Sequence, residues 1–288
     1  MDLITLRAGD ATVELAPDAG GAVTRYWLER GGVTQEWLRP TPPGSLRAGN
    51  SARAAAFPLV PYSNRIREGR FSFRGRAVVE RLNRPPERHA IHGHGWQARW
   101  TATDVRAAEA RLEYRHPAGA WPWAYRATQR FTITPSSLTV ALSLSNESAT
   151  PMPAGIGWHP YFSRTPGATI TADVAGMWLT DAEIMPTELV APPAAPFGRG
   201  RDNCFVGWSR RATIDWPERG ARLLVRAEAP LDYLVVFTPA RRPFFCVEPV
   251  SHVTDAFNLA EAGRSDTGIQ VLAPDETLET SVVLTPEL

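Results

Sequence analysis

Alternation of apolar and polar residues over short segments constrains the fold of this chain more than any other feature. Every second residue from Leu138 to Leu144 is a large aliphatic one, and a similar alternation returns from Leu278 to Leu284. Comparable runs cover Phe71–Glu80, Arg111–His116, Tyr125–Thr134, Arg222–Arg226, Tyr233–Thr238 and Phe244–Glu248. A period of two gives each strand one buried and one solvated face, which is typical of antiparallel sheets. The sequence therefore predicts an all-β fold, a large antiparallel β-sandwich with little helix.

Glycine and proline interrupt the chain too often for long helices, since there are 22 glycines and 26 prolines among 288 residues. One short helix is expected at Ala256–Gly263, with Asp255 as its N-cap. The proline-rich stretch Pro186–Pro196 is predicted to be a long loop, because the strand patterns on its two sides are alike in composition. The whole chain, residues 1–288, is thus expected to form a single domain.

No lysine occurs anywhere in the chain, so all 31 basic residues are arginines. This excludes mechanisms that need a Schiff-base lysine, a lysine-bound pyridoxal phosphate or the lysine of a P-loop. Arginine stays protonated at any working pH, so these side chains can bind or orient a substrate but transfer protons poorly. Proton transfer is left to six histidines, the carboxylates, the tyrosines and two cysteines.

The formal net charge is +1, from 31 basic and 30 acidic residues, which predicts neither a nucleic-acid partner nor a membrane partner. The chain begins Met1-Asp2-Leu3 without a cationic start, and no window approaches 18 uncharged apolar residues. A cytoplasmic location is therefore expected. Cys204 and Cys246 stand far apart in apolar surroundings, which is typical of buried structural thiols.

Four segments place polar groups where chemistry can occur, and the first two lie in the N-terminal third of the chain. Asn64 and Arg65 follow two prolines and could offer fixed donors to hydroxyl oxygens, or form a turn beside a solvated arginine. His92 and His94 alternate with glycines, and Trp96 follows. These histidines could form hydrogen bonds to a ligand, serve the core or bind a metal. No carboxylate occurs among the nine residues after His94, which disfavours a metal.

The other two segments each place an ionisable residue before a proline. His159 precedes Pro160 and so lies on extended backbone, where apolar neighbours are expected to bring its titration near neutrality. A histidine among aromatic residues is also typical of a satisfied core position. Glu248 ends an apolar strand before Pro249. Burying this carboxylate is costly unless it is hydrogen-bonded or has a task, which makes it a candidate functional residue.

These segments, in this order, resemble the aldose 1-epimerase (mutarotase) family. The resemblance extends from about Ala55 to Thr285, and five modest motifs carry it. They are Asn64-Arg65-Ile66 with Gly69 and Phe71, His92-Gly93 with Trp96, His159 with Tyr161-Phe162, Asp202-Asn203 with Phe205, and Glu248-Pro249. The closing segment Leu272-Ala273-Pro274-Asp275-Glu276-Thr277 is also similar to the family's end.

The resemblance implies a galactose mutarotase-like β-supersandwich that interconverts the α and β anomers of a free aldose. By similarity, Glu248 would be the general base and His159 the general acid. The sugar would be held by the side chains of Asn64, Arg65, His92 and Asp202. No metal or cofactor is implied, and the partners expected are a monosaccharide and, at most, a second copy of the chain.

Tryptophans add candidates for stacking on the sugar, because their flat apolar faces suit its C–H surface. Trp96, Trp158 and Trp208 are such candidates, although core packing is an equal possibility for each. Two positions depart from galactose-specific members of the family. His94 stands where those members have a second glycine, and Trp158 replaces a small polar residue before the histidine. Both departures bear on which sugar is bound rather than on the reaction.

Three other readings of the sequence remain open. A hexose-6-phosphate 1-epimerase would need converging arginines, which Arg67, Arg70, Arg74 and Arg76 could supply next to Asn64. A non-catalytic carbohydrate-binding β-sandwich would use the tryptophans but would not need Glu248 and His159 together. A glycosidase would need two carboxylates around one bond, such as Asp202 and Glu248.

Overall fold

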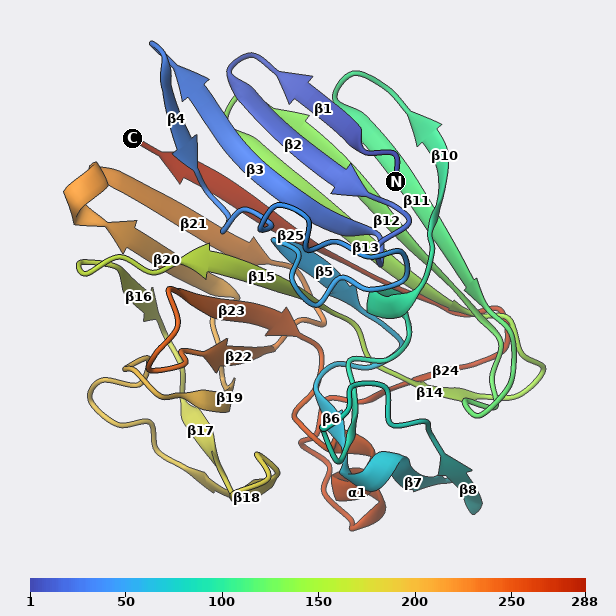
Figure 1. The fold of residues 1–288 in the computed structure, drawn as a ribbon. Coiled ribbons are helices and arrows are strands. Elements are labelled where there is room, and N and C mark those ends of the chain that lie inside the picture. Colours follow the sequence, from blue (N-terminus) through green and yellow to red (C-terminus); the bar gives the residue numbers. More distant parts are fainter.

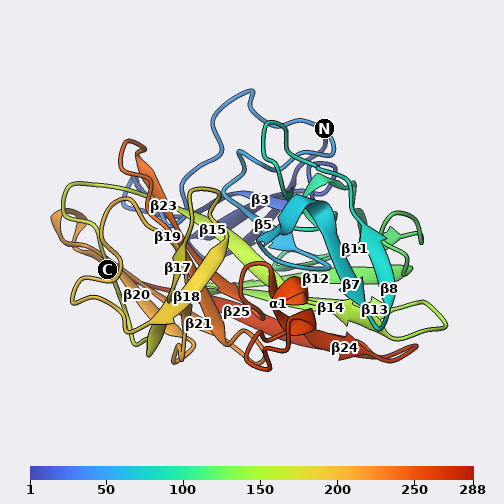
Figure 2. The same ribbon diagram turned by 90° about the horizontal axis from the view of Figure 1, so that it is seen from below.

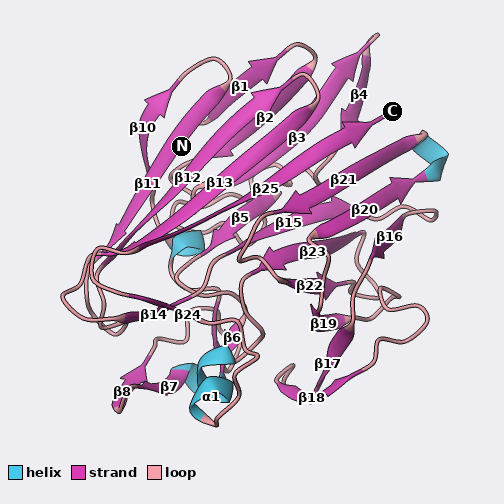
Figure 3. Cartoon of the chain, turned by 180° about the vertical axis from the view of Figure 1, so that it is seen from behind, coloured by secondary structure: helices cyan, strands magenta, loops and turns pink.

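A computed structural model describes residues 1–288, and it confirms the predicted antiparallel β-sandwich (Figure 1). About 50% of the chain is strand and about 5% is helix. Figure 3 shows how scarce helix is, since the one α-helix, α1 (Ala256–Glu261), is six residues long. No helix is long and apolar enough to cross a membrane.

The larger sheet has eleven antiparallel strands, and it carries the site described below. Across the sheet they run β1 (Ile4–Ala8), β2 (Ala11–Ala16), β3 (Ala22–Arg30), β5 (Ala56–Leu59), β15 (Gly157–Ser163), β23 (Phe244–Val250), β22 (Tyr233–Phe237), β19 (Asp202–Val206), β17 (Gly176–Thr180) and β18 (Pro186–Val190). Strand β4 (Val33–Glu36) pairs with β3. Strands β5, β15 and β23, which are far apart in the sequence, therefore lie side by side at its centre.

The second sheet has eight strands and forms the other layer of the sandwich. Their order is β10 (Thr101–Val105), β11 (Glu109–His116), β12 (Tyr125–Thr134), β13 (Ser137–Asn146), β25 (Thr277–Glu287), β21 (Ala221–Ala227), β20 (Arg211–Trp216) and β16 (Thr169–Ala172). Three two-stranded sheets lie beside these layers: β6 (Arg65–Ile66) with β9 (Ala90–Ile91), β7 (Arg70–Phe73) with β8 (Arg76–Val79), and β14 (Met152–Ala154) with β24 (Gln270–Leu272).

Strands of the eight-stranded sheet bury one face in the main apolar core, whereas central strands of the larger sheet divide their side chains between this core and a smaller cluster. The main core of 52 buried residues includes Val140, which lies opposite Phe131 on β12 and Val282 on β25. A smaller cluster of 14 buried residues includes Tyr161 on β15, whereas its neighbour Phe162 belongs to the main core. The two faces of β15 therefore serve different clusters. Figure 2 shows the loop from β4 to β5 on the side of the larger sheet that faces away from the smaller one.

The structure corrects three local predictions. The run Phe71–Glu80 is a hairpin of β7 and β8, because the backbone at Arg74 and Gly75 has positive φ. The expected loop Pro186–Pro196 begins with strand β18 at the sheet edge. The predicted helix ends at Glu261 rather than Gly263, and Asp255 does not cap it.

The side chain of Asp255 has a different role from the capping that was predicted. Its Oδ1 accepts hydrogen bonds from the backbone N–H of Arg67 (2.9 Å) and the amide of Asn258 (2.7 Å). It therefore ties the start of α1 to the segment after β6. The two cysteines agree with their prediction, since both are buried free thiols.

Candidate active site

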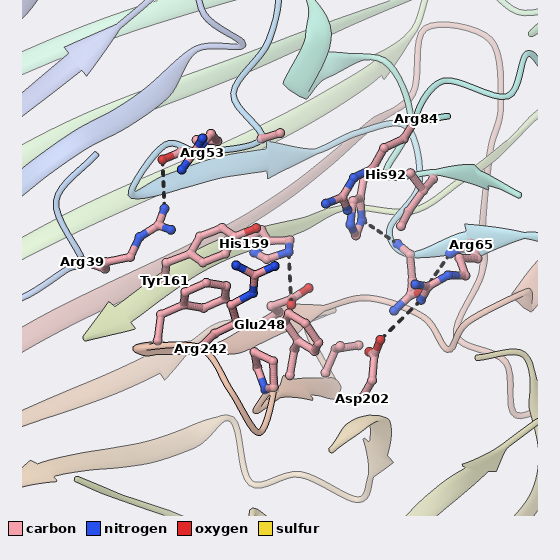
Figure 4. Close-up of a pocket in the computed structure, with 17 residues that line it drawn as sticks. Arg39, Arg53, Arg65, Arg84, His92, His159, Tyr161, Asp202, Arg242 and Glu248 are labelled. Carbon is pink, nitrogen blue, oxygen red and sulfur yellow. Dashed lines mark hydrogen bonds and ion pairs between the residues drawn. The ribbon is translucent and has the colours of Figure 1, made fainter. Parts of the chain in front are cut away.

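A pocket of about 460 Å³ opens on the face of the larger sheet that carries the smaller apolar cluster (Figure 4). Its lining comes from the sheet centre and from the loops around it. The residues are Arg39, Ala52, Arg53, Asn64, Arg65, Arg84, Ile91, His92, His159, Tyr161, Asp202, Val235, Phe237, Pro239, Arg242, Phe244 and Glu248. Polar and charged side chains are the majority, which suits a ligand rich in hydroxyl groups.

Strand register brings His159 and Glu248 together on the floor of this pocket. Tyr161 on β15 lies opposite Cys246 on β23, so counting two residues along each strand sets His159 opposite Glu248. Nε2 of His159 is 3.3 Å from Oε1 of Glu248, and the two side chains are 7% and 3% exposed. Residues 89 positions apart in the sequence thus form one buried imidazole–carboxylate pair.

Burial acts on the two members of this pair in opposite directions. It raises the pKa of Glu248 well above its usual value, to which the charge of Asp202 adds. It lowers the pKa of His159 to about 3, with the Arg84 cation adding to the effect. The prediction that His159 titrates near neutrality was therefore wrong, because its ring is fully enclosed rather than partly desolvated. Burial thus favours the uncharged form of each member, a protonated carboxyl and a neutral imidazole.

Aromatic packing, rather than hydrogen bonding, orients the His159 ring. The ring stacks on Tyr161, with centroids 4.7 Å apart and planes at 15°, and it lies 4.5 Å from the Phe57 ring. Its Nδ1 is buried and has no hydrogen-bond partner in the protein. The imidazole is thus held in place while its Nε2 faces the carboxylate of Glu248.

The sheet of β6 and β9 positions Asn64 and His92 on one wall of the pocket. Both residues have positive φ, of 54° and 63°, and they bond to each other. The N–H of Asn64 donates to Nδ1 of His92 (3.1 Å), and the N–H of His92 donates to the carbonyl of Asn64 (2.9 Å). Because Nδ1 accepts a hydrogen bond, the proton of the neutral ring is on Nε2, where it can be donated to a ligand.

Gly93 makes this wall possible. Its φ is +66°, and a Cβ there would lie 2.1 Å from the carbonyl oxygen of Val60. Trp96 supports the same turn, since its indole N–H donates to the carbonyls of Ile91 (3.2 Å) and Gly93 (3.1 Å). The His-Gly pair therefore fits close against the loop before Asn64.

Arg65 and Asp202 form the end of the pocket nearest β19. Nη1 of Arg65 lies 3.8 Å from Asp202 and 3.3 Å from Oδ1 of Asn64, and Nε bonds Glu87 at 3.2 Å. Burial raises the pKa of Asp202, an effect that the Arg65 cation opposes. The side-chain amide nitrogen of Asn64 bonds no protein group, so it remains a donor for a ligand.

Comparison with known proteins agrees with this geometry. The model of the protein family described as aldose 1-epimerase matches residues 2–285 of this chain. The uncharacterized protein YphB of Escherichia coli (strain K12) is 32% identical over 303 residues, covering 100% of this chain and 99% of that protein.

The chain belongs to the aldose 1-epimerase family.

Solved structures of similar proteins share the fold over nearly their whole length. A protein of Escherichia coli K12 that is provisionally described as an aldose 1-epimerase has a TM-score of 0.89 and 29% identity, with 99% of each chain covered. A galactose mutarotase-like protein from Clostridium acetobutylicum has a TM-score of 0.84 and 20% identity, with 98% of this chain and 94% of that chain covered. The second similarity concerns the fold alone.

Within this aldose 1-epimerase fold, the predicted residues Asn64, Arg65, His92, His159, Asp202 and Glu248 all line one pocket. The tryptophans do not. Trp158 directly precedes His159 on β15, so its side chain points to the opposite face and lies in the main core. Trp96 is 1% exposed beneath the His92 turn, and Trp208 belongs to the main core. None of the three offers a face to a sugar in the pocket.

The two departures from the galactose-specific pattern also lie away from the pocket. The Trp158 side chain is on the opposite face of the sheet. His94 turns to Glu80, 2.8 Å from its Nε2, and to the hydroxyl of Tyr125, 3.0 Å from its Nδ1. Neither residue distinguishes sugars by direct contact.

The arginines predicted for a phosphate are in the wrong place, and others take the pocket. Arg67 pairs with Asp181 and Glu183, at 3.5 and 3.6 Å. None of Arg67, Arg70, Arg74 and Arg76 lines the pocket, whereas Arg39, Arg53, Arg84 and Arg242 do. Sequence reasoning missed these four because they lie in loops. One signal was available: the chain contains three Arg-Pro dipeptides, and their arginines, 39, 84 and 242, all line the pocket.

One set of donor atoms in this site could hold a metal ion. His159, Cys246 and Glu248 each offer a ligand atom, all within 4.8 Å of one another. Burial raises the pKa of the Cys246 thiol well above its usual value, so the thiolate that a metal needs is disfavoured. The His-Gly-His motif makes no such set, because His92 and His94 point to different sides of their turn.

Proposed function

We propose that this protein is an aldose 1-epimerase that interconverts the α and β anomers of an aldose. The observation that carries the proposal is the buried His159–Glu248 pair, 3.3 Å apart on the floor of a polar pocket. Ring opening of a cyclic hemiacetal needs one base and one acid that act together, and this pair supplies both.

Ring opening would proceed by two proton transfers. The Glu248 carboxylate takes the proton of the anomeric hydroxyl, whose oxygen becomes the aldehyde oxygen as the bond from C1 to the ring oxygen breaks. The His159 imidazolium gives its proton to the ring oxygen, which leaves as a hydroxyl group. The working form needs the shared proton on His159. Burial and Asp202 raise the pKa of Glu248 and so oppose this form, and the Arg65 cation offsets part of their effect.

Reclosure would reverse these transfers on the other face of the aldehyde. After rotation about the C1–C2 bond, the hydroxyl oxygen attacks C1 and returns its proton to the imidazole. The aldehyde oxygen takes a proton from the Glu248 carboxyl, so that the pair regains its starting state. No proton or electron is gained or lost overall, and the reaction as written needs no cofactor.

The other pocket residues would hold the sugar through its hydroxyl groups. Nε2–H of His92 and the amide of Asn64 are donors that bond no protein group, and Asp202 is an acceptor next to Arg65. Fixing the ring oxygen beside His159 and the anomeric hydroxyl beside Glu248 accelerates both transfers, because it removes the cost of bringing the groups together.

Polarimetry tests the proposal directly. Freshly dissolved α-glucose or α-galactose changes its rotation as it approaches the anomeric equilibrium, and an epimerase accelerates that change without consuming sugar. Galactose, glucose, xylose and arabinose form the panel for neutral aldoses. A non-catalytic sugar-binding protein would leave every rate unchanged, and a glycosidase would release reducing sugar from a glycoside instead.

A further inference from the structure

The pocket gathers positive charge in a chain that is otherwise balanced. Its lining includes five arginines, Arg39, Arg53, Arg65, Arg84 and Arg242, but only two carboxylates, Asp202 and Glu248. The whole chain has 31 basic and 30 acidic residues. A neutral sugar needs hydrogen-bond donors and acceptors, but it does not need this excess of cations.

Four of these arginines have no carboxylate partner. Arg65 pairs with Glu87 and Asp202, whereas Arg39, Arg53, Arg84 and Arg242 take part in none of the ion pairs of the protein. Elsewhere in the chain some arginines are paired, as Arg222 is with Asp215 and Arg264 with Asp266, and others are not. The pocket differs in that four unpaired arginines surround one cavity. The cations around the pocket are therefore free to bind an anion from outside.

Arg39 is the best fixed of the four. Its Nη2 donates to the carbonyls of Arg53 (2.9 Å) and Ala54, and its guanidinium lies 4.3 Å from the centroid of Tyr161. Its Nε is buried without a hydrogen-bond partner. Burial lowers the pKa of Arg39, and no carboxylate pairs with its guanidinium.

Prolines and loop contacts hold other arginines at the rim. Arg84 and Arg242 each precede a proline, which keeps their backbone extended. The loop that carries Arg242 is tied down by Arg164, whose Nη1 donates to the carbonyl of Pro239 (2.6 Å) and whose N–H donates to that of Pro243 (2.9 Å). Figure 4 shows Arg84 and Arg242 reaching toward the His159–Glu248 pair from different sides.

We propose that the substrate is an anionic aldose, one that carries a carboxylate or a phosphate ester, and that Arg39, Arg53 and Arg242 bind this group while the anomeric carbon lies at His159 and Glu248. The inference rests on the proposed function, because the position of the anomeric carbon beside His159 and Glu248 follows from the proposed reaction. Guanidinium groups match carboxylate and phosphate oxygens in paired, charge-assisted hydrogen bonds. Arg84 adds positive potential at the opposite wall.

A substrate panel tests the inference. Exchange between α and β anomers is measured at equilibrium by NMR for glucose, glucuronate and glucose 6-phosphate, with galactose and galacturonate as a second series. We expect kcat/KM for the anionic member to exceed that of its neutral counterpart by at least about tenfold, the value of one charge-assisted hydrogen bond. Preference for the uronate or for the phosphate ester identifies the anion, and the preference should weaken as salt is added.

A matched pair of variants locates the anion. Arg242→Gln removes a cation that lines the pocket, whereas Arg241→Gln removes its exposed neighbour, which does not line it. We expect Arg242→Gln to lower the ratio of kcat/KM for anionic over neutral sugar by about tenfold, and Arg241→Gln to leave that ratio unchanged. Arg53→Gln should act in the same direction as Arg242→Gln.

The outcomes separate this inference from the proposed function. Equal kcat/KM for neutral and anionic sugars, with both changed alike by Arg242→Gln, would overturn the inference and leave the epimerase intact. If no sugar is exchanged, the proposed function fails, and calorimetric binding of glucuronate and glucose 6-phosphate against glucose then decides. If the anions bind more tightly than glucose and Arg242→Gln abolishes that difference, the anion site is supported even without catalysis. If all three sugars bind equally, the anion site is overturned together with the proposed function.

Discussion

Two histidine–carboxylate pairs in this protein have the same chemistry and different surroundings. His159 and Glu248 lie 3.3 Å apart and line the pocket, whereas His94 and Glu80 lie 2.8 Å apart and do not. The His94 side chain is the more exposed of the two imidazoles, at 21% against 7%. Neither proximity to a carboxylate nor exposure therefore distinguishes the histidine that lines the pocket.

The two imidazoles differ in how they are held. Both ring nitrogens of His94 are bonded, to Glu80 and to Tyr125, and its ring stacks on His116 with centroids 4.0 Å apart. His159 has an unbonded Nδ1 and faces only Glu248. Bonds at both ring nitrogens fix His94 within the fold, whereas only the His159–Glu248 pair lines a pocket in which it could act on a ligand.

Replacing the carboxylate of the pocket pair should give the largest effect. Glu248→Gln keeps the shape of the side chain but removes the base, so we expect the rate of mutarotation to fall by about 100- to 10,000-fold. The thermal unfolding midpoint should stay close to that of the wild type, which separates lost chemistry from lost folding. A folded variant that keeps more than about half the rate would assign the base to another residue, with Asp202 the next candidate.

Adding His159→Asn to Glu248→Gln should cost far less than the product of the two single effects. Each single variant disables the same concerted proton transfer, so the second change removes little that remains. The measurement is a double-mutant cycle on kcat/KM. Fully multiplicative losses would show that the two residues act in separate steps, contrary to the proposed mechanism.

The pH profile should place the acid limb of kcat/KM well below the ordinary histidine pKa of about 6.5. The pair works while it holds one proton. It gains a second only near the His159 pKa of about 3, and it loses its last as pH rises through the raised pKa of Glu248. Rates from about pH 4 to about pH 9 test this. An acid limb at about pH 6.5 would contradict the enclosure of His159.

Glu80→Gln is the matched change in the other pair, and its effect should fall on stability. We expect the free energy of unfolding to drop by about 1–3 kcal/mol, because His94 loses a charged partner in a buried site. The mutarotation rate per folded molecule should change by less than about twofold, since Glu80 contacts no pocket residue that transfers protons. A rate loss as large as that of Glu248→Gln would mean that the two pairs act together.

Chelation should have the smallest effect of all. The donor set of His159, Cys246 and Glu248 includes a thiol whose pKa burial raises, and the proposed reaction transfers only protons. Dialysis against a strong chelator should therefore leave the rate unchanged. A loss that zinc or manganese restores would assign this set to a metal.

Sequence patterns predicted the strands well, and they singled out two residues that the structure places together in the pocket. The period-two runs at Tyr125–Thr134 and Phe244–Glu248 are strands, and His159 and Glu248 stood out because each interrupts an apolar segment before a proline. The orientation of Trp158 could also have been predicted from this alternation. This residue is adjacent to His159 on the same strand, so its side chain must point to the opposite face of the sheet.

Other features depend on contacts between distant segments, so local pattern could not supply them. Asp255 looks like a helix cap, but it bonds the backbone of Arg67, 188 residues away in the sequence. The rim arginines come from three separate loops that meet only in the folded chain. The enclosure that lowers the pKa of His159 likewise arises from packing across strands β5, β15 and β23.

The shared use of β15 and β23 by the core and the site has a consequence for insertions and deletions. One added residue in either strand would turn His159 or Glu248 inward and bring a core aromatic such as Trp158 or Phe245 to the pocket. The loops that carry Arg39, Arg84 and Arg242 have no alternation of inward and outward side chains that an added residue could reverse. Length changes that leave the protein folded and reactive should therefore be confined to those loops, where they would alter which sugar enters and not what happens to it.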